Sequence, residues 1–214
     1  MLILSEADVR AVYSGQEAMR DAITAIAGAE RATAAGEASV PPQTHLDYPL
    51  GSGSRKYARI QASMLPAADA GAARLYTPAG GTANEREIVV LWRYEDLNFE
   101  ALMFGGWINV MRTAAACGLA TDLLARKDAR TVAIIGAGRQ ARRQLSAVCA
   151  VRPIRQALVY SPTLEHREAF AAEMRTELDL DVVAVPSPQQ ALEPADVICA
   201  ATRRPSAPAV PSSW

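Results

Sequence analysis

Hydrophobic positions near the N-terminus recur at helical spacing. Met19, Ile23 and Ile26 recur at helical spacing and fall on one face of a helix. Two helix starts precede them: Ser5 lies before an acidic turn, and Ser14 lies three residues ahead of Glu17, the spacing of a capping box. The N-terminal segment is therefore predicted to be helical.

The pattern changes after this helical segment. Residues 34–53 contain scattered glycine, proline and serine residues around Pro41-Pro42, which predicts a surface connection rather than a regular helix. Short runs rich in β-branched and aromatic residues follow, separated by turn-forming residues, and they predict a small, mostly antiparallel sheet. These runs are Tyr57 to Met64, Ala73 to Tyr76, Ile88 to Trp92 and Ala101 to Phe104.

In the second half, apolar strands and amphipathic helices alternate. An alanine- and leucine-rich helix from about Val110 to Ala125 leads into this part and is expected to connect two domains. Alternation of this kind predicts a parallel sheet wound by right-handed crossovers. The predicted strands are 131–135, 156–160, 181–185 and 196–200, and the predicted helices are about 140–149, 164–178 and 188–192. We therefore expect an α/β fold, with an α+β domain over 1–126 and a doubly wound parallel sheet over 127–214.

Composition narrows the classes of partner. Half of the residues are apolar, and 22 basic residues nearly balance 23 acidic ones, which argues against nucleic acid and anionic membranes and favours small ligands. Cys117, Cys149 and Cys199 are widely spaced among apolar residues and are expected to be reduced core residues. His45 and Asp47 lack a third ligand, so no metal site is expected. The N-terminus resembles neither a signal peptide nor a membrane span, which predicts a cytoplasmic protein.

A glycine-rich turn joins the strand 131–135 to the next helix. Gly136 and Gly138 follow the strand at once, and Ala141 fills the third small position of the G-x-G-x-x-G/A pattern. In that pattern the first glycine makes the tight turn, the second lets the backbone approach a pyrophosphate, and the third small residue allows close packing of helix and strand. The turn predicts a Rossmann-type site for NAD or NADP; the alternative is that the glycines only permit a tight turn.

The residues at the following strand ends bear on the form of the cofactor. Ser161 occupies the position that meets the adenosine ribose, where a carboxylate would favour NAD. Thr163, His166 and Arg167 follow it and suit either a 2′-phosphate or, as the favoured account, a solvated first helical turn. The choice between NAD and NADP therefore stays open. Thr202 ends the fourth strand, where the nicotinamide side of the cofactor is expected to pass.

Several motifs together resemble the ornithine cyclodeaminase and mu-crystallin family, over residues 4–214. The most specific is Arg112–Ala116 some two dozen residues ahead of the run Ile135–Ala141. The opening LSEADV, Met64-Leu65-Pro66 and the strand Asp196–Thr202 support it. The resemblance implies a homodimer whose N-terminal half supplies substrate contacts and the dimer surface, while the C-terminal half holds a nicotinamide cofactor. It also implies chemistry at the carbon–nitrogen bond of a small amino acid or cyclic imine.

The resemblance also implies roles for individual residues. The substrate-binding candidates are Gln43, Arg74 and Arg112, and the cofactor-binding candidates are Arg112, Thr113, Gly136, Gly138, Arg139, Gln140, Ser161 and Thr202. Arg112 is a bidentate group suited to a carboxylate.

The chain departs from the family pattern at several positions. Arg74 stands in place of a lysine that helps to move protons, Gln43 in place of an arginine, and Ser63 in place of an acidic residue. The family's catalytic aspartate and last strands lie beyond the position matching Trp214, so no catalytic residue is assigned and the cofactor domain is expected to be incomplete. Two functions remain open: an NAD(P)-dependent oxidoreductase or cyclodeaminase, and a catalytically silent protein of the mu-crystallin type that binds NAD(P)H or another small ligand.

Overall fold

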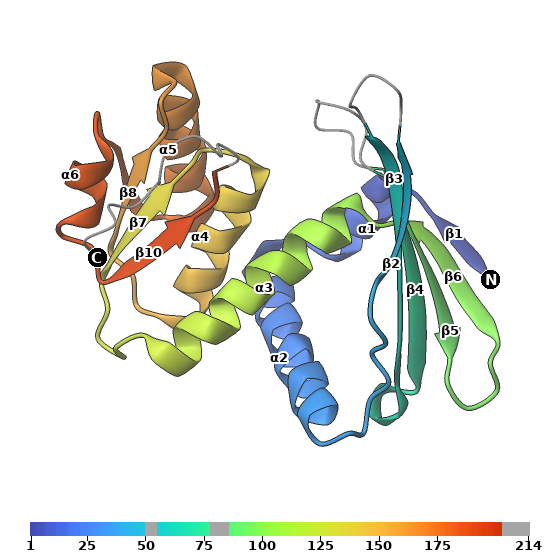
Figure 1. Ribbon diagram of the computed structural model, residues 1–214. Helices are drawn as coiled ribbons and strands as arrows, with labels where there is room; N and C mark the ends of the chain where they lie inside the picture. Colours follow the sequence, from blue (N-terminus) through green and yellow to red (C-terminus); the bar gives the residue numbers. More distant parts are fainter. Residues whose placement is uncertain (50–54, 78–85, 203–214) are drawn as a thin grey trace. The chain divides into compact units, whose positions relative to one another are not determined.

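The chain folds into two compact units that share two helices (Figure 1). The computed structural model describes residues 1–49, 55–77 and 86–202. The first unit comprises Met1–Ser14 and Ala25–Asn109, and the second comprises Gly15–Thr24 and Val110–Trp214. Helices α2 (Gly15–Ala34) and α3 (Gly106–Leu124) contribute to both units. The helix expected to connect two domains therefore belongs, for most of its length, to the second unit.

A six-stranded sheet forms the first unit. Its strands are β1 (Leu2–Leu4), β2 (Thr44–Pro49), β3 (Arg55–Leu65), β4 (Ala70–Thr77), β5 (Arg86–Arg93) and β6 (Phe99–Phe104). They lie in the order β1-β6-β5-β4-β3-β2, and all neighbours are antiparallel except β1 and β6. The mostly antiparallel sheet expected from the sequence is confirmed.

The prediction of an irregular connection over 34–53 is wrong in part. Residues 44–49 form β2, which pairs with β3 along its whole length. The strand lies at the edge of the sheet and Pro49 lies at its end, and both are positions where proline is tolerated because no ladder hydrogen bond is lost. The scattered prolines and glycines therefore led to the prediction of an irregular connection where a short edge strand lies.

The two predicted helix starts are both present, with different caps. Helix α1 (Glu6–Val12) begins after Ser5, which forms a reciprocal capping box with Asp8. At the start of α2, however, the expected box with Glu17 is absent, because the Ser14 hydroxyl donates to the carbonyl of Arg10 instead. In the part of the chain that the structure describes, no helix combines the length and apolarity needed to cross a membrane.

The second unit is built on a four-stranded parallel sheet in the order β10-β7-β8-β9. Its elements are β7 (Thr131–Ile135), α4 (Arg139–Val151), β8 (Gln156–Tyr160), α5 (Leu164–Leu178), β9 (Asp181–Ala184), α6 (Pro188–Leu192) and β10 (Val197–Ala200). The strand order reverses between β7 and β10, which is the doubly wound arrangement of Rossmann-type folds. The predicted parallel sheet is confirmed.

Both faces of this sheet are buried, as the nearly continuous apolar sequence of β7 requires. Val132 and Ile134 point to one face and pack in a cluster with residues of α4 and α5. Ala133 and Ile135 point to the other face and pack in a cluster with residues of α6. The alternation along one strand thus fixes the layers on both sides.

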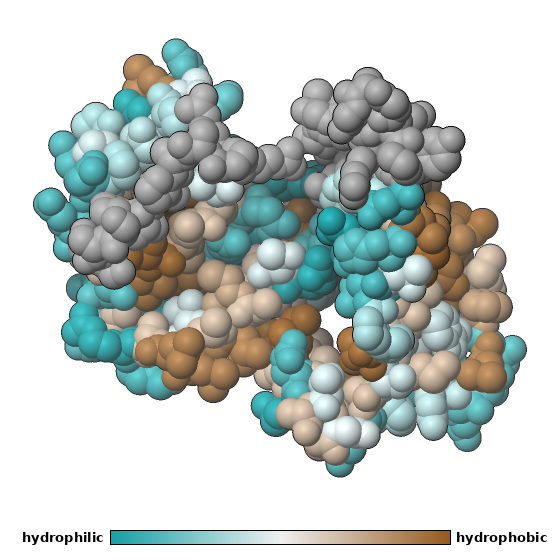
Figure 2. Space-filling view, viewed as in Figure 1, coloured by the Kyte–Doolittle hydropathy of each residue, from teal (hydrophilic) through white to brown (hydrophobic). Residues whose placement is uncertain are grey.

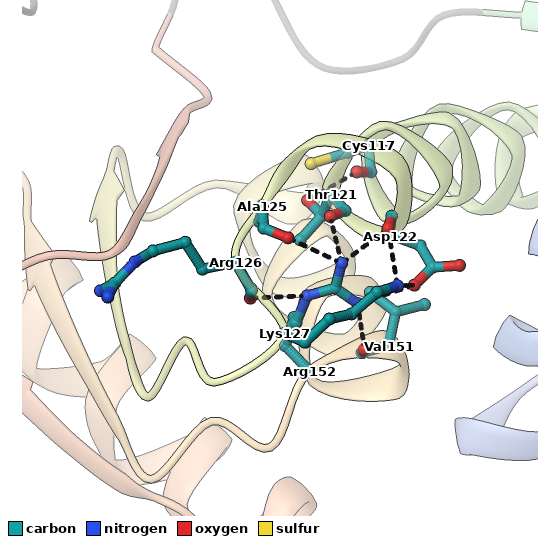
Figure 3. Close-up of polar contacts among 8 residues, drawn as sticks. All are labelled: Cys117, Thr121, Asp122, Ala125, Arg126, Lys127, Val151 and Arg152. Atoms are coloured by element: carbon teal, nitrogen blue, oxygen red, sulfur yellow. Dashed lines mark hydrogen bonds and ion pairs between the residues drawn. The ribbon is translucent and has the colours of Figure 1, made fainter.

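Arg152, just after α4, holds the C-terminal end of α3 (Figure 3). Its side chain is 2% exposed, and its guanidinium donates to the Asp122 carboxylate over 2.7 Å. The same guanidinium donates to backbone carbonyls at the end of α3 and just beyond it, namely those of Thr121, Asp122, Ala125 and Arg126. Carbonyls at the end of a helix lack some of their helical partners, and Arg152 supplies a donor to each of these. The contact also holds the pKa of Asp122 below its usual range.

Replacement of Arg152 by leucine is expected to lower the free energy of unfolding by about 3 kcal/mol, because four carbonyls and the Asp122 carboxylate each lose a charged hydrogen-bond donor at once. Urea denaturation measures the change. Lys127 contacts the same Asp122 carboxylate from solvent, so Lys127→Ala is the matched control and should cost less than about 1 kcal/mol. Equal losses in the two variants would contradict this role of Arg152.

Candidate functional site

The carboxyl ends of β7 and β10 meet at the point where the strand order reverses. Ala200 lies opposite Ile135, and the Ala201 amide donates to the Ile135 carbonyl over 2.8 Å. In open α/β sheets the connections leave such a point in opposite directions, and ligands bind in the crevice between them. The glycine turn follows β7 and Thr202 follows β10, so both candidate segments lie at this edge.

Gly136 is required by the fold itself. Its φ of +115° is a backbone conformation that other residues rarely adopt, and a Cβ atom here would lie 2.5 Å from the Ala201 carbonyl oxygen. The Gly136 amide also donates to the Tyr160 carbonyl over 2.8 Å. This glycine therefore lets the ends of β7, β8 and β10 meet.

Gly138 has no comparable requirement in the described structure. It is the N-cap residue of α4, its φ is −85°, and no atom lies within 4 Å of the place that a Cβ would take. The tight-turn alternative accounts for Gly136 but leaves the second glycine unexplained. Open space beside the backbone at the N-terminus of a helix is what the approach of a pyrophosphate requires.

Arg142 positions the turn, and the sequence reasoning missed it. One guanidinium nitrogen donates to the carbonyls of Ala137 and Gly138, over 2.7 and 3.2 Å. The side chain also pairs with Glu173 at 2.7 Å and lies over the ring of Phe170. The turn is thus held through its carbonyls by α4 and α5, while the first amides of α4 have no partner within the helix. The sequence feature that could have indicated this role is an arginine four residues after the second glycine.

The first turn of α4 carries no acidic residue, which suits an anionic ligand. Arg139 is exposed there. The side-chain oxygen of Gln140 is buried without a hydrogen-bond partner among the described residues. Both residues keep their predicted place beside the turn.

Ser161 lies buried at the end of β8, next to the strand that carries the turn. Its carbonyl accepts a hydrogen bond from Arg167 over 3.0 Å. Thr163 is the N-cap residue of α5 and His166 is exposed in its first turn, as in the helical account of these residues. Thr202 is exposed after β10. The structure therefore brings the predicted phosphate, ribose and nicotinamide positions to one edge of one sheet.

The remaining candidates are divided between the units. Arg112 and Thr113 lie on α3 within the second unit, and Arg112 is exposed. Gln43 lies just before β2 and Arg74 on β4, both in the first unit.

Arg74 takes part in a polar cluster within the first unit. Its guanidinium contacts a carboxylate oxygen of Glu87 at 3.3 Å and the side-chain oxygen of Asn109 at 3.4 Å, and it lies near the ring of Tyr76. Glu87 is 3% exposed, so the pair is shielded from solvent. Arg74 was predicted from the sequence, whereas Glu87 and Asn109 were not; the signal in the sequence was a glutamate at the start of an apolar strand.

The register gives the six-stranded sheet two unlike faces. Gln61 is directly opposite Arg74, so their side chains share a face, and Arg59 shares it as well because it lies two residues before Gln61. The opposite face presents an apolar row that crosses four strands. It consists of Ile60, Leu75, Ile88 and Phe104.

Among the residues that the structure describes, no group of three or more histidine, cysteine, aspartate or glutamate side chains could hold a metal ion.

Known proteins are similar to this chain in sequence and in fold. A profile of the ornithine cyclodeaminase/mu-crystallin family matches residues 77–214. A Rhizobium meliloti protein named as a dehydrogenase is 31% identical over 220 residues, all of this chain and 65% of its own length. An L-lysine cyclodeaminase of Streptomyces rapamycinicus is 38% identical over 115 residues, 52% of this chain and 33% of the relative.

A solved structure extends the comparison. Thermococcus litoralis Δ(1)-pyrroline-2-carboxylate reductase, in complex with NADH and L-proline, aligns with a TM-score of 0.80 and 33% identity. The alignment covers 94% of this chain and 62% of the reductase. The chain thus spans less than two thirds of the length of the dehydrogenase-named relative and of the reductase.

Replacement of Gly136 by alanine is expected to lower the free energy of unfolding by about 2 kcal/mol or more, because the backbone is strained and the new methyl group meets the Ala201 carbonyl. Thermal and urea denaturation measure the loss. Gly138→Ala, at the open N-cap position, should cost less, about 1 kcal/mol or below. Similar losses at the two positions would contradict the different roles assigned to the glycines.

Proposed function

This chain belongs to the ornithine cyclodeaminase/mu-crystallin family, and on that premise we propose that it binds NAD(H) or NADP(H) on the turn 136–141. We further propose that the protein transfers hydride at the carbon–nitrogen bond of a small amino acid or cyclic imine. The single observation that carries the proposal is the open space at Gly138, beside the helix N-terminus at the point of strand reversal. The family and its relatives supply the class of reaction.

Each candidate residue has a physical role in this proposal. The amides at the start of α4 bind the pyrophosphate, and Arg139 and Gln140 flank it. Ser161 meets the ribose, and Thr202 lies on the nicotinamide side. Arg112 and Thr113, on α3, complete the set; the fixed guanidinium fork of Arg112 suits a carboxylate or a phosphate.

In this proposal the two domains have different roles. Residues 127–214 hold the dinucleotide, whereas residues 1–126 supply substrate contacts and the dimer surface. Gln43, Arg74 and Arg112 contact the substrate, and the arginines bind its carboxylate. The reductase that resembles this chain is solved with NADH and L-proline, and another relative is named an L-lysine cyclodeaminase. Both names support a substrate with a carboxylate next to the reacting carbon–nitrogen bond.

The nicotinamide ring, when bound, accepts or supplies the hydride. The protein residues orient the substrate and hold charges in place. Glu87 and Asn109 fix the guanidinium of Arg74, and an arginine is a poor proton shuttle, so the role of Arg74 is to bind and orient rather than to transfer a proton.

That property favours a second candidate function: a catalytically silent protein of the mu-crystallin type that binds NAD(P)H or another small ligand. The observation behind it is Arg74 itself, which stands where the family resemblance places a proton-moving lysine and is bound in a shielded ion pair. The two candidates share the dinucleotide site and differ in turnover.

Titration of the purified chain with NADH and with NADPH, followed by nicotinamide fluorescence, tests the proposal. We expect saturable binding that Gly138→Val weakens at least tenfold, because the side chain would occupy the space of the pyrophosphate. Circular dichroism should show an unchanged fold. Gly28→Val, a substitution at another glycine with open space around its Cβ position, should keep the binding. Equal affinities of wild type and Gly138→Val would refute the cofactor assignment.

Cyclic imines added to the protein loaded with NADH or NADPH, and diamino acids added to the protein loaded with NAD⁺ or NADP⁺, separate the two candidates. A substrate-dependent change in nicotinamide absorbance, or release of ammonia from a diamino acid, supports the oxidoreductase or cyclodeaminase, and binding without either supports the silent protein.

We also propose a homodimer that forms through the apolar row of the six-stranded sheet. Leu75 is 42% exposed and Phe104 is 50% exposed in the single chain, and Ile60 next to Leu75 is also exposed. In Figure 2 hydrophobic atoms gather over the side of this unit on which β1 and β6 lie. Contiguous apolar area of this kind marks an interaction surface, and a second copy of the chain is the occupant that the family resemblance implies.

Leu75→Glu is expected to shift the protein toward the monomer, because a buried charge would face its partner copy across the interface. Sedimentation velocity measures the shift. Leu124→Glu, at an exposed leucine at the end of α3 in the second unit, is the matched control and should leave the assembly unchanged. A Leu75→Glu protein that folds and remains dimeric would place the interface elsewhere.

A further inference from the structure

All three cysteines pack against one hydrophobic cluster of the second unit, although they are far apart in the sequence. Cys117 lies on α3, Cys149 on α4 and Cys199 on β10. The sulfur atoms of Cys117 and Cys199 are 3.7 Å apart, and the two residues are separated by 82 positions in the chain. Their thiols are free, as the sequence predicted, but their pairing was not visible in it.

The three thiols have different surroundings. Cys117 is half-buried, and the hydrogen bond from the Cys199 thiol holds its pKa below the usual range of a thiol. Cys199 is 3% exposed, and its hydrogen bond to Cys117 together with burial raises its pKa. Burial also raises the pKa of Cys149 to about 12. Cys117 is thus the reactive thiol, Cys199 lies within reach of it, and Cys149 is unreactive.

We propose that Cys117 and Cys199 form a redox-sensitive pair that a hydroperoxide oxidises to a disulfide joining α3 to β10. The Cys117 thiolate attacks one peroxide oxygen, the O–O bond breaks, and an alcohol or water leaves, which gives a sulfenic acid. The Cys199 sulfur then attacks the sulfur of Cys117, the S–O bond breaks, and water leaves with the Cys199 proton. Two thiols and one hydroperoxide thus give one disulfide, one water and one alcohol or second water, and an added dithiol reverses the change.

The local geometry needs only a small movement. A disulfide has an S–S length of roughly 2.05 Å, so the two sulfur atoms must approach by about 1.7 Å from their present 3.7 Å. Rotation of the two side chains and a slight shift of α3 against β10 can supply that distance. Because the residues come from different elements, the bond would close a long loop of chain and tie the helix to the sheet.

The position of the pair links it to the glycine turn. Cys199 is two residues before Ala201, whose carbonyl lies against Gly136. A shift of β10 toward α3 would therefore reach the turn, and we expect oxidation to change the affinity for the dinucleotide severalfold. This consequence rests on the proposed function, whereas the disulfide itself does not.

Hydrogen peroxide added to the fully reduced full-length chain, followed by removal of the oxidant and thiol counting in denaturant, tests the pair. We expect the count to fall from three thiols to one and the intact mass to fall by two hydrogen atoms. Trypsin separates the cysteines into peptides 113–126, 144–155 and 176–203, so the expected product joins the first and third peptides. Dithiothreitol should restore all three thiols.

Single serine variants provide the controls. Cys149→Ser should form the same link, whereas Cys117→Ser and Cys199→Ser should not, with circular dichroism to verify that each variant folds. A count that stays at three, a bond between two chains, a link to peptide 144–155, or added oxygen atoms without a link would overturn the proposal.

Titration of the oxidised and the reduced wild type with NADH then measures how far the disulfide changes the affinity for the dinucleotide. Equal affinities would overturn the link to the glycine turn and leave the disulfide assignment intact. Absence of binding in both forms would contradict the proposed function and would again leave the peptide map unaffected.

Discussion

The close approach of two backbone segments at the end of the parallel sheet is the constraint on which the proposed site depends. The Ala201 carbonyl, after β10, lies where a side chain on Gly136 would stand. Only glycine permits this contact, and the contact lets the chain turn directly from β7 into α4. The edge of the sheet and the N-terminus of a helix thereby meet at the reversal of strand order, the ordinary place for a nucleotide in such folds.

Three arginines of the second unit contribute to the proposed site in different ways. Arg142 holds the carbonyls of the turn from the side of α4, so that the direction of its amides is fixed by packed structure. Arg152 binds the carbonyls at the end of α3 and so anchors that helix to the second unit. Arg112, a candidate contact for substrate or cofactor, is carried on α3 and thus belongs to the same unit as the glycine turn.

Much of the second unit was predictable because its signals are local. The strands 131–135 and 156–160 and the helix 164–178 have the predicted bounds, since apolar runs and helical periodicity there agree with the fold. The edge strand β2 was missed because the prolines around it suggest an irregular segment, whereas its pairing with β3 depends on a partner strand that the local sequence does not reveal. Long-range contacts, such as Arg142 with the turn carbonyls and Cys117 with Cys199, leave no periodic trace in a single sequence.

The most direct test of the dinucleotide site is amide hydrogen exchange of the chain with and without NADH, resolved to short peptides. We expect slower exchange in the peptides that cover 136–142 and 200–202, and unchanged exchange in the edge strand 44–49. Protection confined to the first unit, or no protection at the turn while NADH is bound, would contradict the claim that the dinucleotide lies on the turn at Gly138.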